Sequence, residues 1–194
     1  MNWLAHLLLS KPDTESRLGN LLADLVKGAE RNNLKENIQL GIKHHQQIDL
    51  FTDSHLIVHR SKQRISSSYR RFAGILIDGF YDHFLAKNWV LYSNQTLENF
   101  TAEIYESFLT YPEPLPSYAN QVITRMAKED WLGSYRTLSG IEYLLSRLSY
   151  RFSQRFQKQK DFQLKLAINE LINNYNSLEA DFLEFFPELQ QIAC

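Results

Sequence analysis

Helical periodicity dominates the pattern of apolar and polar residues along this chain, and the strict alternation typical of strands is nearly absent. Apolar residues recur at steps of three and four, in segments separated by turn residues. The predicted helices cover residues 3–9, 15–27, 34–51, 56–66, 69–89 and 96–110, a segment that begins near Ser117, and residues 138–157 and 161–185. The pattern therefore predicts an all-α protein, folded as a single compact helical bundle of about seven to nine helices.

One domain is expected to comprise residues 1–194, because a chain of this length commonly forms a single core. The proline-rich segment 112–116 interrupts the helical pattern but is too short to indicate a second domain. We expect the site residues to be concentrated in residues 1–89 and scaffold helices to occupy residues 96–190. The reason is that all six histidines lie in the first part of the chain: His6, His44, His45, His55, His59 and His83.

The composition is that of an ordinary globular protein, with 44% hydrophobic and 22% charged residues and a net charge of −1. A near-neutral chain does not suggest nucleic acid as a partner. The single cysteine, Cys194, excludes an internal disulfide framework and favours a reducing compartment. No apolar run reaches the length of a membrane span, and the first residues lack the basic region of a signal peptide. We therefore expect a cytoplasmic protein with no membrane partner.

The fifth predicted helix carries two carboxylates on its core-facing side. Asp78 and Asp82 stand one helical turn apart. They share a stripe with Ile75, Leu85 and Trp89. Like charges at this spacing repel each other, and an unpaired buried charge is costly. The stripe therefore predicts that a positive group faces Asp78 and Asp82.

Further pairs of polar residues on apolar helix faces extend this pattern. His45 and Asp49 lie one turn apart on an apolar stripe. Asn20 and Asp24 repeat the same spacing, and His6 stands within the apolar run WLAHLLL. Helical bundles build metal sites from imidazoles and carboxylates that face each other on several helices. Because structural zinc prefers thiolates, this set favours Mn²⁺, Mg²⁺ or Fe²⁺.

Each of these pairs also has a structural interpretation. His45 and Asp49 could form a satisfied buried pair, and His6 could be a core histidine bonded to the backbone. His83 lies about 100° round the helix from its neighbour Asp82, so it is expected to contact the substrate or a metal ligand. The other three histidines are expected at the surface.

A stretch without acidic residues follows the histidine-rich segment, from Ser54 to Ile77. Its cations are Arg60, Lys62, Arg64, Arg70 and Arg71. A solvated helix face is one interpretation of this basic stretch. The other is a docking surface for an anionic partner or a phosphate group.

Six segments of the chain, in order, resemble the acyl carrier protein phosphodiesterase family. They are MNWLAHLLLS (1–10), GNLLADLVKG (19–28), GIKHHQQIDLFTD (41–53), IDGFYDHFL (77–85), WLGSYR (131–136) and FLEFFPEL (182–189). The family is considered related to HD-domain phosphohydrolases, which are all-α metal enzymes with His and Asp ligands from several helices. The resemblance thus implies an HD-domain-like fold and a phosphodiesterase that uses Mn²⁺. Such an enzyme removes 4′-phosphopantetheine from holo-acyl carrier protein to give the apo form.

The resemblance also implies roles for particular residues. They are His6, Asn20, Asp24, His45, Asp49, Asp53, Asp78, Asp82 and His83. The metal ligands are expected among Asp24, His45, Asp49, Asp78 and Asp82. His83 or His6 is the candidate to protonate the serine oxygen that leaves. Contacts to the substrate are expected from Asn20, Asp53, Arg60, Arg64, Arg70 and Arg71.

One position departs from the family pattern. An arginine commonly follows the histidine that corresponds to His45, whereas Gln46 and Gln47 stand here. Lys43 or the basic stretch would then supply the charge that faces the phosphodiester. The basic stretch would also dock holo-acyl carrier protein, the expected protein substrate, because carrier proteins are acidic.

Two other functions fit the same residues. A related metal phosphohydrolase could act on a nucleotide or another small phosphoester. A helical module without enzymatic activity could bind an acidic protein, with the His and Asp pairs serving only the structure. The oligomeric state has no signature in the sequence.

Overall fold

All regular elements are helical in the computed structural model, which describes residues 1–155 and 164–193, so the predicted all-α class is confirmed. These residues form twelve α-helices and three short 3₁₀ helices and contain no strand. The α-helices are α1 (Trp3–Leu9), α2 (Thr14–Leu25), α3 (Ala29–Asn32), α4 (Glu36–Ser54), α5 (Leu56–Arg64), α6 (Ala73–Lys87), α7 (Leu97–Leu109), α8 (Ser117–Lys128), α9 (Trp131–Ser134), α10 (Leu138–Arg155), α11 (Ile168–Asn173) and α12 (Tyr175–Ala193). The 3₁₀ helices are η1 (Ser67–Phe72), η2 (Trp89–Leu91) and η3 (Leu164–Ala167).

The helices are shorter and more numerous than the predicted seven to nine. Two of them, α3 and α9, are single turns that the periodicity does not reveal. The last predicted helix is divided at Asn174, whose side-chain amide donates to the carbonyl oxygen of Glu170 and so competes with the helical backbone. The beginning of that predicted helix and the end of the preceding one lie outside the described residues.

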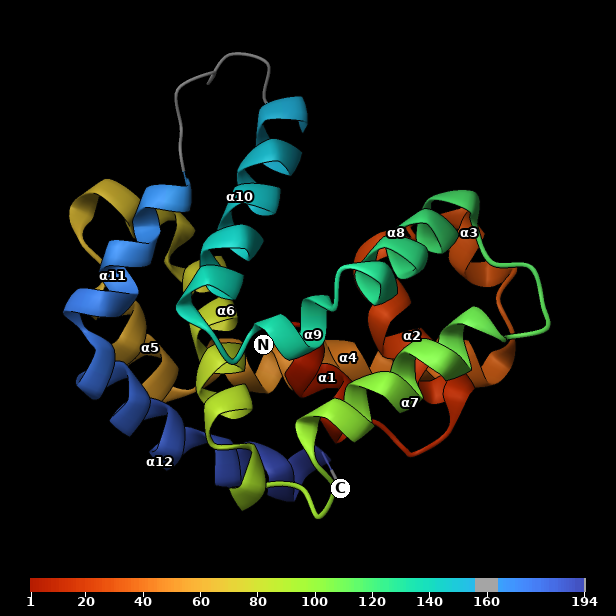
Figure 1. Cartoon of the computed structure of the whole chain (residues 1–194), viewed down its shortest axis with the longest axis horizontal. Coiled ribbons are helices and arrows are strands. Elements are labelled where there is room, and N and C mark those ends of the chain that lie inside the picture. Colours follow the sequence, from red (N-terminus) through yellow and green to blue (C-terminus); the bar gives the residue numbers. More distant parts are fainter. Residues whose placement is uncertain (156–163, 194) are drawn as a thin grey trace.

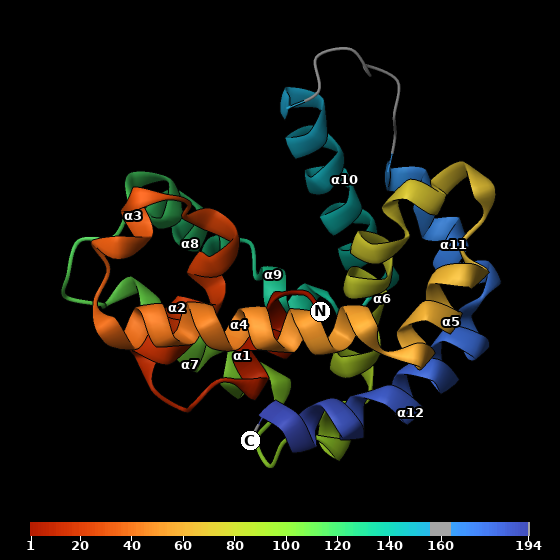
Figure 2. The ribbon, with the colours of Figure 1, turned by 180° about the vertical axis from the view of Figure 1, so that it is seen from behind.

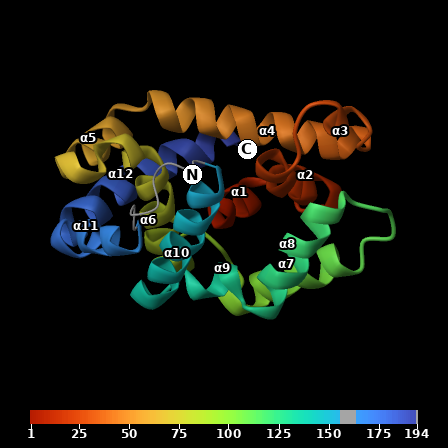
Figure 3. The ribbon, with the colours of Figure 1, turned by 90° about the horizontal axis from the view of Figure 1, so that it is seen from above.

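The longest axis of the molecule is followed by α4, which connects two groups of helices (Figures 2 and 3). At one end lie α2, α3, α7 and α8, and at the other lie α5, α6, α11 and α12, with α1 and α9 between them (Figure 1). The helices α8 and α10 rise on either side of α9 (Figure 1). Within the described ranges, no helix combines the length and the apolar character needed to cross a membrane.

The central element of the core is α6, which packs against α1, α5, α10 and α12. Its residues are buried on nearly every side, including Phe80, Phe84 and Leu85. A helix that is apolar all round is typical of a core position. Asp82 and His83 are therefore buried by the neighbours of α6 rather than by a local feature of the chain.

Two glycines let α2 and α4 cross at very short distance. A Cβ atom at Gly19 would stand 2.2 Å from the carbonyl oxygen of Ile38, and one at Gly41 would stand 2.4 Å from that of Ser16. No side chain larger than hydrogen fits at either position without moving one of the helices. The crossing brings the end of α2, with Asp24, beside the middle of α4.

Candidate metal centre

Three potential metal ligands converge from α1 and α4. The Nε2 atoms of His6 and His45 each lie 3.1 Å from a different oxygen of Asp49, so that each ring N–H donates to one carboxylate oxygen. The two imidazole rings are stacked, with their centroids 3.7 Å apart and an interplanar angle of 13°. Each of the three residues offers one potential ligand atom, and these three atoms all lie within 4.8 Å of one another. We call this set the His–His–Asp cluster.

The local sequence explains two of the three positions. His45 and Asp49 are four residues apart on one helix, which puts them on the same face. His6 arrives from α1 and adds a second imidazole, so the predicted pair becomes a triad. The sequence analysis placed His6 among the proton donors, whereas the structure brings it into the group that could hold an ion.

The protonation states of the cluster suit a metal. Burial lowers the pKa of His6 to about 4, and this effect outweighs the attraction of Asp49. Burial alone would raise the pKa of Asp49, but hydrogen bonds from His45 and His6 hold it well below its usual range. His6 is therefore neutral and Asp49 ionised near neutral pH, and these are the forms that bind metals.

The donor set of the cluster supports the same conclusion. The Nδ1 atoms of His6 and His45 are buried and have no hydrogen-bond partner among the described residues. Two imidazoles and one carboxylate form a mixed donor set that suits several divalent transition metals. An ion bound between the rings and Asp49 would replace the two Nε2 protons, as metal binding to histidine generally does.

Two further carboxylates, those of Asp24 and Asp78, flank the cluster. Asp24 accepts a hydrogen bond from Trp3 Nε1 at 2.8 Å, and its other oxygen lies 3.9 Å from His45 Nε2. The amino group of Met1 lies 3.1 Å from Asp78 Oδ1 and 3.5 Å from Asp49 Oδ1. Burial disfavours this charged amino group, but attraction by the two carboxylates outweighs burial and raises its pKa to about 10. The positive group predicted to face Asp78 is thus the Met1 amino group.

The positive partner of Asp82 is a helix terminus. Its two oxygens accept hydrogen bonds from the backbone N–H groups of Leu4, at 2.8 Å, and Ala5, at 3.3 Å. These amides belong to the first turn of α1, where backbone N–H groups lack helical partners and the helix dipole is positive. Burial raises the pKa of Asp82 to about 7, although the two amides oppose the rise. Asp82 therefore holds α1 in place and is not brought into the His–His–Asp cluster.

His83, the other predicted proton donor, is also separate from the cluster. Its Nδ1 lies 2.8 Å from the carbonyl oxygen of Tyr135, and its Nε2 lies 2.8 Å from the hydroxyl of Tyr175. Both ring nitrogens are thus engaged, and burial lowers the pKa of the imidazole. The structure gives His83 contacts that join α6 to the segment after α9 and to α12.

The predicted substrate contacts Asn20 and Asp53 are likewise outside the cluster. The Asn20 amide donates to the carbonyl oxygen of Ser16, and its buried Oδ1 has no partner among the described residues. Asp53 is largely exposed and accepts a hydrogen bond from Lys62 Nζ at 2.7 Å.

The basic stretch is partly neutralised by α12. Arg60 and Arg64 each donate through Nε to Asp181 at 2.8 Å, and Arg60 also contacts Glu184. The sequence analysis missed this arrangement because the acidic partners lie more than a hundred residues away. Arg70 donates to the Lys62 carbonyl oxygen at 3.4 Å, and the Arg71 guanidinium lies 4.6 Å from the Phe72 ring centroid.

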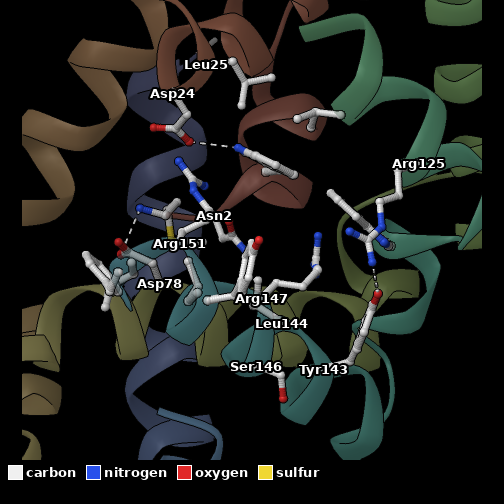
Figure 4. A pocket seen from close by; sticks show the side chains of 18 of the residues that line it. Asn2, Asp24, Leu25, Asp78, Arg125, Tyr143, Leu144, Ser146, Arg147 and Arg151 are labelled. Carbon is white, nitrogen blue, oxygen red and sulfur yellow. Dashed lines mark hydrogen bonds and ion pairs between the residues drawn. The ribbon is translucent and has the colours of Figure 1, made fainter. Parts of the chain in front are cut away.

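A cavity of about 820 Å³ opens beside the cluster. Four of the predicted metal ligands line it: Asp24, His45, Asp49 and Asp78. The opposite wall comes from α8 and α10, which contribute Arg125, Arg147 and Arg151 together with Tyr118, Tyr143 and Tyr150. In Figure 4, Asp24 and Asp78 lie on one side of this cavity and Arg125 and Tyr143 on the other, with Arg147 between them.

These arginines lie on α8 and α10, in the part of the sequence that was expected to be scaffold and not to carry site residues. The sequence does contain a signal, because Arg147 and Arg151 stand one turn apart on α10 and each follows a leucine, Leu144 or Leu148, by three residues. An arginine on an apolar helix face supports the same inference as an aspartate there. It predicts a partner of opposite charge.

The comparison with known proteins decides the family. The family model described as acyl carrier protein phosphodiesterase matches residues 1–189. The chain belongs to this family. The match includes both walls of the cavity, from α1 and α4 to α8 and α10.

Relatives are similar over their full length. The acyl carrier protein phosphodiesterase of Yersinia pestis is 32% identical over 194 residues, which cover 100% of this chain and 97% of the relative. Those of Serratia proteamaculans and Pectobacterium atrosepticum are 31% and 30% identical with the same coverage. No solved structure matches the chain, so the HD-domain-like arrangement expected from the sequence is not confirmed by a structural neighbour.

Proposed function

We propose that this protein hydrolyses the phosphodiester that joins 4′-phosphopantetheine to a serine of holo-acyl carrier protein, which releases the apo form. The observation that carries this proposal is the family membership over residues 1–189, because it extends over the complete cavity and its His–His–Asp cluster. The size of the cavity supports it as well. Pockets for small ligands typically enclose about 300–1,000 Å³, and a flexible pantetheine arm is a ligand of that class.

The metal would be held by His6, His45 and Asp49, with Asp24 and Asp78 placed to complete the ligand set. We propose Mn²⁺, with Mg²⁺ and Fe²⁺ as alternatives, because carboxylates and imidazoles together suit these ions. When bound, such an ion supplies Lewis-acid activation of water and offsets negative charge on the phosphate oxygens. Ligands from two helices also agree with the HD-domain-like architecture that the resemblance implies.

The protein's own groups would orient this chemistry. Asp49 contacts both imidazoles and so fixes the orientation of the rings toward each other. A proton must also reach the serine oxygen that leaves. Between the two predicted donors, His83 is engaged at both nitrogens, while His6 lies in the cluster itself. We therefore propose His6 as a metal ligand rather than as the proton donor.

A small phosphoester is the second candidate substrate. The favouring observation is that the cavity could enclose a complete small molecule. The third possibility, a helical module without activity, is disfavoured by membership of a family of phosphodiesterases.

Intact mass spectrometry of holo-acyl carrier protein tests the proposal directly. The carrier protein is incubated with this protein and Mn²⁺, with EDTA in a parallel sample and the variant Asp49→Asn in another. We expect the loss of one phosphopantetheine mass only with the unchanged protein and the metal. An unchanged carrier mass, although metal is bound to the protein, would favour a small phosphoester as the substrate.

A further inference from the structure

Arg147 occupies an unusual position on the wall of the cavity opposite the cluster. Its guanidinium carbon lies 3.5 Å from the centroid of the Trp131 ring and 5.3 Å from that of Tyr143. Stacking on an aromatic face is favourable for a guanidinium and holds its plane in one orientation. The guanidinium of Arg147 is therefore held in one orientation at the wall of the cavity.

The charge of this guanidinium has no acidic partner in residues 1–155 and 164–193. No carboxylate of this part of the chain lies within ion-pair distance of Arg147, whereas Arg125, on the same wall, pairs with Glu129 at 2.9 Å. The Nε and Nη2 atoms of Arg147 are buried and have no hydrogen-bond partner among the same residues. Buried cations are normally paired, because an unpaired one is costly. Within the described residues, the guanidinium of Arg147 therefore has no anionic partner.

The nearest polar neighbour does not replace an anion. The hydroxyl of Tyr135 is buried and also lacks a hydrogen-bond partner within the described residues. Burial raises the pKa of Tyr135, and the nearby charge of Arg147 opposes this rise only in part. Tyr135 is thus a neutral neighbour and supplies no negative charge to Arg147.

We propose that Arg147 binds the phosphate group of the pantetheine arm, opposite the His–His–Asp cluster. This inference rests on the proposed function and adds a substrate-binding residue to it. Arginine suits the role, because its planar fork can form two parallel hydrogen bonds with one phosphate. Leu144 and Val122, which line the same wall, would contact the apolar part of the arm.

A phosphate on the arm fits this site better than a carboxylate on the carrier surface. Arg147 is half-buried and lines the cavity, where a flexible arm can reach and a folded protein surface cannot. Arg151, one turn further along α10, lines the cavity and is exposed. It therefore remains accessible to the carrier protein itself.

Calorimetric titration with free 4′-phosphopantetheine and with pantetheine, which lacks the phosphate, tests the assignment. Both ligands are added to the full chain with and without EDTA, so that phosphate binding by a metal is measured separately. We expect tighter binding of the phosphorylated ligand in both conditions. Arg147→Met should reduce its affinity by about tenfold or more, the usual effect of losing charge-assisted hydrogen bonds, and should leave pantetheine binding unchanged.

Two variants make the test specific. Arg147→Lys keeps the charge without the fork and should lose only part of the affinity. Arg136→Met is the matched control, because Arg136 pairs with Glu98 and does not line the cavity. It should bind both ligands as the unchanged protein does. Unfolding curves by circular dichroism establish that each variant is folded.

Equal affinity of folded Arg147→Met and unchanged protein for phosphopantetheine would overturn the assignment. If this variant does not fold, the titrations of the unchanged protein in EDTA test the assignment instead. Equal affinities for phosphopantetheine and pantetheine would overturn it. A different result would refute the proposed function without refuting the phosphate site. Phosphate-dependent binding through Arg147 without hydrolysis of holo-acyl carrier protein would refute the reaction and leave the phosphate site intact.

Discussion

Asp49 contacts two histidines that come from different helices. The second of them, His6, extends the predicted His45–Asp49 pair to a candidate metal centre. Each carboxylate oxygen contacts one imidazole, at 3.1 Å in both cases. In a purely structural pair, one histidine would satisfy the carboxylate and no second ring would be needed. The stacked second ring is more easily explained by a ligand set than by core packing.

Replacement of Asp49 and of Asp82 separates the two roles that a buried aspartate has in this protein. Asp49→Asn should lower the affinity for Mn²⁺ by more than about tenfold, because it removes the charge that the ion would meet. Asp82→Asn should bind Mn²⁺ as the unchanged protein does, since both Asp82 oxygens contact α1 amides. Isothermal titration with Mn²⁺ measures both affinities.

The reverse result would reassign the metal site. If Asp82→Asn lost Mn²⁺ and Asp49→Asn retained it, the ion would be held by α6, as the stripe in the sequence predicts. Asp82→Ala is the control for stability. It removes both hydrogen bonds to the first turn of α1 and should reduce the free energy of unfolding by about 1–2 kcal/mol, the usual cost of a lost cap.

Periodicity predicted which side chains are buried but not what they contact. Of the predicted stripe, Asp82, Leu85 and Trp89 are buried, whereas Ile75 and Asp78 are half-buried and line the cavity; both aspartates meet positive groups. Those groups are the Met1 amino group and two backbone amides, more than seventy residues away in the chain. Helical spacing describes one helix at a time, so it cannot identify partners supplied by another helix.

At the scale of elements, the α2–α4 crossing sets the geometry of the site. Asp24 is the penultimate residue of α2, and His45 and Asp49 lie on α4. Their separation therefore depends on how closely the two helices approach each other. Gly19 and Gly41 allow that approach, and their role is not visible in the sequence, where a glycine within a helix only lowers its propensity.

Gly41→Ala should destabilise the protein and disturb the metal site together. The new methyl group would meet the Ser16 carbonyl oxygen at 2.4 Å and the Gly19 Cα at 2.9 Å, so α2 and α4 must separate. We expect a loss of about 1–3 kcal/mol in the free energy of unfolding, typical of overpacking, with weaker Mn²⁺ binding. Thermal unfolding and metal titration measure the two effects.

Gly74→Ala is the matched control on α6. A Cβ atom there would have Lys62 Cε as its nearest neighbour, at 3.8 Å, which is an ordinary contact. This variant should unfold at the same temperature as the unchanged protein or slightly above it, since alanine stabilises helices relative to glycine. If both alanine variants were equally stable, the close crossing would not determine the stability of the fold.

The basic stretch shows where prediction from single elements ends. Its charge pattern on α5 and η1 predicted a docking surface, but Arg60 and Arg64 contact Asp181 on α12. Asp181 is buried, so these arginines also have a structural role. Meanwhile α10, which was expected to be scaffold, supplies Arg147 and Arg151 to the cavity. The helix class followed from periodicity, whereas the distribution of charge depended on how the helices meet.

At the scale of the whole molecule, the cavity joins two parts of the chain with different chemistry. Residues before position 83 supply the imidazoles and carboxylates on one wall, and α8 and α10 supply the arginines on the other. A phosphodiester carries negative charge and needs cations, while hydrolysis needs an activated water. Opposing walls of this kind can divide the two tasks within one cavity, with an ion on one wall and Arg147 on the other.

Comparison of the complete carrier protein with a small diester tests the proposed substrate at this scale. A serine derivative of phosphopantetheine contains the scissile bond but none of the acidic carrier surface. For holo-acyl carrier protein, kcat/KM should fall about tenfold or more as salt rises from about 0.05 to 0.5 M, because salt screens docking between exposed charges. For the small diester, kcat/KM should start lower and change less, since this substrate lacks the charged surface through which the carrier protein docks.

Each part of this comparison addresses a different step. A steep salt dependence that appears only in KM with the carrier protein would place the electrostatic contribution in docking, at exposed cations such as Arg151 rather than in the cavity. Equal kcat/KM values for the two substrates, with the same response to salt, would mean that the carrier surface contributes nothing. The cavity would then be a general site for small phosphodiesters, and the carrier protein would be only one of the molecules that present such an arm.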